Sequence, residues 1–141
     1  MDKITPPTTI FVVDDDPDVL ISLRFLLETE GFAVRTFANG PTLLSSDLPT
    51  LGDCLIVDYK MAGMTGLDLV SNLRDRQIFA PVVLITAYSN EDVAAKAAAS
   101  GIRHVLLKPH IDESLIAHVL MAMSEASAVW PPPVKPLGIG P

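Results

Sequence analysis

The sequence is poor in cysteine, in basic residues and in long apolar runs. Its single cysteine, Cys54, excludes an internal disulfide, and one cysteine with three histidines gives no zinc-binding spacing. Lys and Arg number 10 against 17 Asp and Glu, so the formal net charge is −7 and no basic cluster is present to bind a nucleic acid backbone. No apolar run reaches the roughly 18 residues of a membrane span, and the first residues lack a signal-peptide pattern. We therefore expect a cytoplasmic protein that contacts neither membrane nor nucleic acid directly.

Proline is concentrated at the two ends of the chain. The 12 prolines include a pair near the N-terminus and a group after residue 130. The 141 residues are 49% hydrophobic and 19% charged, a composition typical of one compact domain rather than of a disordered chain. These boundaries predict a globular domain over residues 8–125 and a flexible, Pro-rich tail over residues 126–141.

Between those ends, short apolar runs alternate with helical patterns. The predicted strands are Thr9–Asp14, Phe32–Phe37, Cys54–Asp58, Pro81–Thr86 and His104–Leu107. The predicted helices are Pro17–Glu30, Pro41–Leu48, Leu67–Arg76, Glu91–Ser100 and Asp112–Glu125. Three of the strands are apolar throughout, which is typical of strands buried on both faces of a parallel sheet. Right-handed crossovers then predict a three-layer, doubly wound (βα)5 sandwich of the α/β class.

Local signals mark several helix ends. Asp16 is placed to accept hydrogen bonds at the start of the first helix, and Gly31 follows its expected end. Thr65 and Asp68 have the spacing of a reciprocal capping box before the third helix.

Polar residues follow four of the five predicted strands. They are Asp14, Asp15 and Asp16 after the first strand, Asp58 after the third, Thr86 and Ala87 after the fourth, and Lys108 after the fifth. In an open α/β sheet these carboxyl ends form the binding edge. Carboxylates gathered there repel one another unless a cation neutralises them, and all-oxygen donors favour Mg²⁺. The sequence therefore predicts a magnesium site beside a lysine.

A metal ion, a lysine and a hydroxyl around one carboxylate are the groups that phosphoryl transfer to that carboxylate requires. Asp58 is the best candidate nucleophile because it is the lone carboxylate ending a central apolar strand. Lys108 and Thr86 are the candidate groups that balance the charge of the phosphoryl oxygens.

Four short motifs together resemble those of receiver domains of two-component response regulators, most closely the FixJ-like receivers. They are Val12–Pro17, Leu55–Met61 with Gly66, Leu84–Ala87 and Leu107–Pro109. They occur in the order and spacing of that family over about residues 8–125. The resemblance implies a parallel five-stranded sheet in the order 2-1-3-4-5, as in CheY-like and flavodoxin-like proteins.

The resemblance also implies roles for particular residues. Asp58 would accept a phosphoryl group from a sensor histidine kinase, a phosphotransfer protein or a small phosphodonor. Mg²⁺ would be held by Asp15, Asp58 and the main-chain carbonyl of Lys60, with Asp14 acting mainly through water. The phosphoryl oxygens would contact Thr86, Ala87 and Lys108. The implied protein is a signalling phosphoacceptor that catalyses only its own phosphorylation and dephosphorylation.

Three positions depart from the family pattern or flank the site. Val105 occupies the position, three residues before Lys108, where an aromatic switch residue is usual, so the standard aromatic rotation is excluded. Tyr88 and Lys60 are therefore candidate modulators of the phosphoryl group and its lifetime.

Two surfaces are candidates for partners. The predicted helix 91–100, strand 104–107 and helix 112–125 form one candidate dimer or output surface, and the first helix carries a second apolar stripe with Ile21 and Phe25. No output domain fits into the tail, so we expect a single-domain regulator.

Three alternatives remain open at this point. A haloacid-dehalogenase-like phosphatase would use Asp14 as its nucleophile and leave Asp58 without a role. An excised receiver of a DNA-binding transcription factor would share every motif above. A dinucleotide-binding module is disfavoured because the first turn lacks the required glycines.

Overall fold

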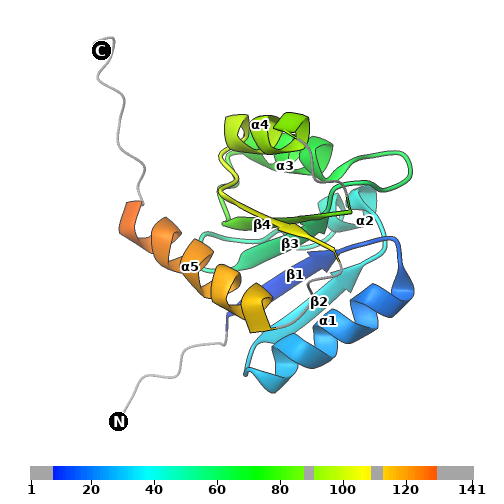
Figure 1. Cartoon of the computed structure of the whole chain (residues 1–141), viewed down its shortest axis with the longest axis vertical. Helices are drawn as coiled ribbons and strands as arrows, with labels where there is room; N and C mark the ends of the chain where they lie inside the picture. The colour runs from blue at the N-terminus through cyan, green and yellow to red at the C-terminus, as the bar shows by residue number, and fades with distance from the viewer. Residues whose placement is uncertain (1–7, 88–90, 109–112, 130–141) are drawn as a thin grey trace.

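The computed structural model describes residues 8–87, 91–108 and 113–129 (Figure 1). The strands are β1 (Thr9–Val13), β2 (Ala33–Phe37), β3 (Cys54–Asp58), β4 (Val82–Thr86) and β5 (His104–Leu107). The helices are α1 (Pro17–Thr29), α2 (Gly40–Leu44), α3 (Gly66–Asp75), α4 (Glu91–Ala99) and α5 (Glu113–Val129). None of the helices among these residues is long and apolar enough to cross a membrane.

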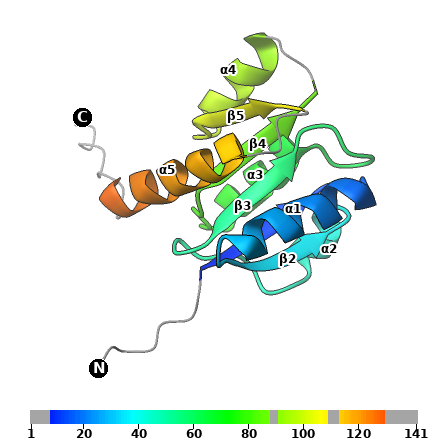
Figure 2. The same ribbon diagram turned by 60° about the horizontal axis from the view of Figure 1, so that its bottom comes forward.

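All neighbouring strands pair in parallel, in the order β2-β1-β3-β4-β5. The predicted fold class and strand order are therefore confirmed. Figure 2 shows α1 and α5 over the same face of the sheet, and α2, α3 and α4 pack on the other face. The middle strands β3 and β4 are buried along their whole length, as their unbroken apolar runs predict.

Each face of the sheet has its own apolar core. Side chains of successive strand residues point to opposite faces, so Phe11 and Val13 join the core under α2, α3 and α4, whereas Ile10 and Val12 join the core under α1 and α5. This double burial holds the strands rigidly, and with them the side chains that follow the strands.

Two helix ends differ from the prediction, and the other bounds agree within one residue. Helix α2 ends at Leu44 rather than Leu48, because the hydroxyls of Ser45 and Ser46 donate to the carbonyls of Pro41 and Leu43 and close the last turn. Helix α5 continues to Val129, so residues 126–129, assigned above to the tail, are helical.

The extension of α5 has a simple cause in the sequence. Ala126 and Ala128 are strong helix formers, and the residue before a proline is disfavoured in the helical conformation. The first such proline is Pro131, so nothing in the sequence stops the helix at Glu125.

The predicted helix caps are present. Asp16 accepts from the amide of Asp18 at 2.9 Å, and Thr65 and Asp68 form the reciprocal capping box at the start of α3. Gly31 follows α1 with φ +96°, a conformation that glycine adopts without strain.

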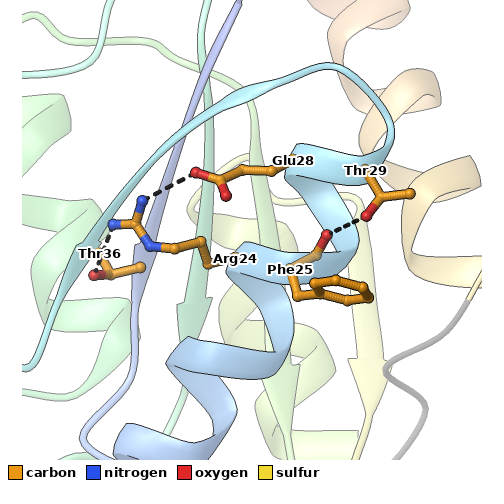
Figure 3. A network of polar contacts seen from close by, with 5 residues as sticks. All are labelled: Arg24, Phe25, Glu28, Thr29 and Thr36. Carbon is orange, nitrogen blue, oxygen red and sulfur yellow. Dashed lines mark hydrogen bonds and ion pairs between the residues drawn. The ribbon is translucent and has the colours of Figure 1, made fainter.

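Helix α1 is tied to β2 on one side and exposed on another. Arg24 contacts Glu28 at 3.1 Å and Thr36 of β2 at 3.4 Å (Figure 3). Phe25 points away from this network, and 75% of it is exposed. An exposed phenylalanine beside the similarly exposed Ile21 leaves an apolar stripe on the outside of α1.

Candidate functional site

The carboxyl ends of β1, β3, β4 and β5 bring four predicted site residues to one edge of the sheet. Asp14 follows β1, Asp58 and Thr86 end β3 and β4, and Lys108 follows β5. The two aspartates and the threonine are each at most 5% exposed. Buried polar groups at the ends of neighbouring parallel strands form the place where an α/β sheet binds ligands.

Lys108 reaches both buried carboxylates. Its Nζ atom lies 3.2 Å from Oδ2 of Asp14 and 3.4 Å from Oδ2 of Asp58. The backbone amide of Lys108 also donates to the carbonyl of Thr86 at 2.8 Å. The sheet ladder therefore extends one residue past β5 and fixes the position from which the lysine side chain projects.

Asp14, Asp15 and Asp58 form a compact group of carboxylates. One oxygen from each lies within 4.8 Å of the others, which is close enough to coordinate a single ion. Asp14 Oδ1 accepts from the amide of Asp16 at 2.9 Å, but the buried Oδ2 has an ion-pair contact with Lys108 and no hydrogen bond. An all-oxygen site with an incompletely satisfied buried atom suits Mg²⁺.

The electrostatics of the site favour added positive charge. Burial raises the pKa of Asp58 to about 6; the charge of Asp14 adds to this increase, and Lys108 offsets only part of it. Burial also raises the pKa of Asp14, although the hydrogen bond from the Asp16 amide and the charge of Lys108 act to lower it. For Lys108, burial lowers the pKa, but Asp14 and Asp58 outweigh it and the net pKa is raised. One lysine therefore does not neutralise the carboxylates.

The turn after Asp58 is held close against β3. The amide of Tyr59 donates to Ile85 at 2.7 Å, and Gly66 at the start of α3 donates to Tyr59 at 2.8 Å. A Cβ atom on Gly66 would clash with the carbonyl oxygen of Asp58. A glycine is thus required for α3 to begin this close to the site. Lys60 lies in the exposed part of this turn.

The remaining predicted site residues lie around this centre. Ala87 is exposed directly after Thr86. Val105 pairs with Leu84 and packs against the core under α2, α3 and α4. Tyr88 lies outside the described residues, as do residues 130–141 of the expected tail.

One part-buried polar cluster, at the other end of β5, has no counterpart among the sequence predictions. The side chain of His104 contacts those of both His118 and Glu125 there. The first two are 14 residues apart and come from a strand and a helix, so no sequence spacing indicates that they meet.

Together the fold and the site define a doubly wound α/β domain with an acidic edge and a buried carboxylate beside a lysine. The model of the response regulator receiver domain family matches residues 10–120. The chain belongs to this family, whose members are signalling phosphoacceptors, and this assignment replaces the phosphatase and dinucleotide-binding alternatives.

Individual relatives support the same assignment. The transcriptional regulatory protein FixJ of Azorhizobium caulinodans is 31% identical over 118 residues, which are 84% of this chain and 56% of FixJ. The structure of the response regulator StyR is 33% identical, with a TM-score of 0.79 over 86% of this chain and 62% of that chain. This domain is thus a FixJ-like receiver.

A second similar structure is a complex with ligands. The response regulator TrrA from Thermotoga maritima, in complex with Mg²⁺ and BeF, is 28% identical, with a TM-score of 0.69 over 82% of this chain and 98% of that chain. The chain spans about half the length of the first curated relatives that it matches.

Proposed function

We propose that Asp58 accepts a phosphoryl group from a phosphohistidine of a sensor histidine kinase or phosphotransfer protein. An Asp58 oxygen forms the new P–O bond while the P–N bond of the donor breaks, and the leaving imidazole nitrogen keeps the bonding electron pair. Hydrolysis of the acyl phosphate by water returns the free carboxylate. The observation that carries this proposal is the buried Asp58 carboxylate, 3.4 Å from Lys108 and within a compact group of acids.

The ionisation state of Asp58 suits a nucleophile near neutral pH. Its pKa of about 6 leaves most of the carboxyl ionised at pH 7, and burial removes the water that would otherwise shield it. Lys108 places an ammonium beside the incoming phosphoryl oxygens. We expect Thr86 and Ala87, which lie at the end of the adjacent strand, to offer a hydroxyl and a backbone N–H to these oxygens.

Mg²⁺ fits the acidic group next to Asp58. Asp14, Asp15, Asp58 and the main-chain carbonyl of Lys60 would hold the ion, with Asp14 acting mainly through water. When bound, the ion supplies the positive charge that balances the phosphoryl oxygens. The chain's own part is to orient Asp58 and to keep the carboxylates close together.

The signal follows from a shift in the Thr86 segment toward the phosphorylated Asp58. Val105 has no aromatic ring to rotate, so Tyr88 and Lys60 are proposed to modulate the switch and the lifetime of the phosphoryl group.

We propose two contact surfaces in the cytoplasm: α1 for the kinase, and α4, β5 and α5 for a homodimer or an output partner. Exposed Leu107, Leu120 and Met121 on β5 and α5 supply apolar area for the second surface.

Labelling by a small phosphodonor tests the proposal. With acetyl phosphate and Mg²⁺, the parent domain is expected to take up one acid-labile phosphoryl group, and Asp58→Asn to lose at least about 100-fold of this labelling. Asp16→Asn is the matched control, because Asp16 is exposed and caps α1. Labelling of Asp58→Asn at the parent level would overturn the proposal, and so would hydrolysis of phosphomonoesters by that variant.

A further inference from the structure

A cluster of three side chains joins β5 to α5 at the end of β5 that is remote from Lys108. His104 begins β5 and only 7% of its side chain is exposed. Its Nδ1 atom lies 2.9 Å from Nδ1 of His118, and its Nε2 atom lies 3.0 Å from Oε1 of Glu125. The two rings meet edge to face, with their centroids 5.2 Å apart. The cluster takes no part in the phosphoryl chemistry proposed above.

The donors and acceptors in this cluster limit the number of protons it can hold. The Glu125 carboxylate only accepts, so His104 Nε2 carries a hydrogen, and in neutral His104 the Nδ1 atom is then an acceptor. His118 must donate from its own Nδ1. A proton added at Nε2 of His118 leaves this bond intact. A second added proton would fall on Nδ1 of His104 and place two N–H donors face to face at 2.9 Å.

The surroundings oppose that second proton. His104 and Glu125 line a cavity of about 190 Å³ together with Arg74 of α3 and Arg103 of the segment before β5. The residues from β4 and the turn before it, Pro81 and Val82, are apolar. Among the described residues that line the cavity, Glu125 is the only acid. Two arginines and His104 therefore share this cavity with a single carboxylate, which can balance only part of any added charge.

We propose that His104, His118 and Glu125 form a proton-operated latch between β5 and α5. The latch is closed while one hydrogen is shared between the two Nδ1 atoms, and it opens when both imidazoles are protonated. Opening releases the second half of α5 from the start of β5. The latch itself does not depend on phosphorylation. Its consequence, an acid-dependent change of the output surface, rests on the proposed function.

Imidazole and amide NMR spectra recorded between about pH 8 and pH 5 test the latch, since histidine protonation falls in this range. On acidification the parent is expected to lose the hydrogen bond between the Nδ1 atoms of His104 and His118, which is followed in the nitrogen spectrum of the imidazoles. Hydrogen exchange of the α5 amides after residue 118 is expected to rise at least about tenfold over the same pH range. A hydrogen bond between the two rings that persists unchanged down to about pH 5 would overturn the proposal.

His118→Gln is the variant that separates a latch from simple packing. The glutamine amide can still donate to His104 Nδ1 but does not titrate, so the domain stays folded and the acid-dependent rise in α5 exchange is expected to disappear. The same rise in His118→Gln as in the parent would contradict the latch. Asp58→Asn is expected to keep the full pH response, so failure of the latch and failure of the phosphoacceptor proposal are distinguishable.

Discussion

The two ends of β5 carry polar clusters that are completed in different ways. At the start of the strand, both ring nitrogens of His104 have partners, at 2.9 and 3.0 Å. Just past its end, Lys108 faces two acids, yet Oδ2 of Asp14 has no hydrogen bond and the pKa of Asp58 is raised to about 6. The first cluster is closed within the chain, and the second is left in need of a positive ligand.

This difference shows how binding sites can be recognised physically. Burying a polar group costs stability unless its partners are buried with it, so most folds satisfy such groups internally. Asp14, Asp15 and Asp58 outnumber the single ammonium of Lys108. The imbalance is tolerated where an external cation and an anionic group complete the charge, and the paired contacts of His104 have no such need.

Removal of Lys108 is expected to give the largest effect on stability. In Lys108→Met, Asp14 and Asp58 face each other without a cation, and the free energy of unfolding at pH 7 should fall by about 3 kcal/mol. The loss should shrink at pH 4, where Asp58 is protonated in the folded state. Urea denaturation at both pH values measures this difference, with Lys96→Met as the control because Lys96 is exposed on α4. An equal loss at both pH values would show that packing, rather than charge, holds the lysine.

Asp58→Asn is expected to stabilise the domain near neutral pH. Because the folded pKa of about 6 exceeds the unfolded value of about 3.9, the folded state binds more protons between these values, and stability falls as pH rises through this window. Between these pH values, the ionisation of Asp58 alone lowers the free energy of unfolding by about 3 kcal/mol. The asparagine amide of the variant does not titrate, so the variant should match the parent at pH 4 and exceed it by about that amount at pH 7.

Thermal unfolding across pH 4 to 8 checks this prediction, with Asp47→Asn as the exposed control. Saturating Mg²⁺ should remove most of the difference at pH 7, because the ion stabilises the ionised carboxylates of the parent. Identical pH profiles for the parent and Asp58→Asn would mean that the Asp58 carboxylate is balanced within the chain as fully as the ring nitrogens of His104 are.

The close approach of α3 to the site gives a third, smaller effect. In Gly66→Ala the new Cβ meets the carbonyl oxygen of Asp58, so the turn must shift, at a cost of about 2 kcal/mol and with weaker Mg²⁺ binding. Gly52→Ala is the matched control, because its Cβ would make only an ordinary contact, 3.9 Å from Thr50 Oγ1. Equal stabilities of the two variants would indicate that the turn after Asp58 is loose.

Most of the fold and the whole carboxyl-end cluster are predictable from the sequence, for one physical reason. Apolar runs place the strands, parallel pairing aligns their ends, and each strand end then delivers its next residue to a common edge. The ends of α2 and α5 were missed because weak local preferences decide them. The His104–His118 contact was missed because it depends on how α5 lies across the sheet, which no short pattern encodes.

The smallest effect is expected for the carboxylate at the start of β5. In Glu125→Gln the side-chain carbonyl can still accept a hydrogen bond from His104 Nε2. Because 39% of the glutamate side chain is exposed, water screens its charge, and the variant should lose less than about 1 kcal/mol of unfolding free energy at pH 7. Denaturation of Glu125→Gln and Asp58→Asn side by side therefore compares the same carboxylate-to-amide change in both clusters. The free energy of unfolding is expected to fall slightly in Glu125→Gln and to rise by a larger amount in Asp58→Asn. Equal changes would mean that the two clusters lack partners to the same extent.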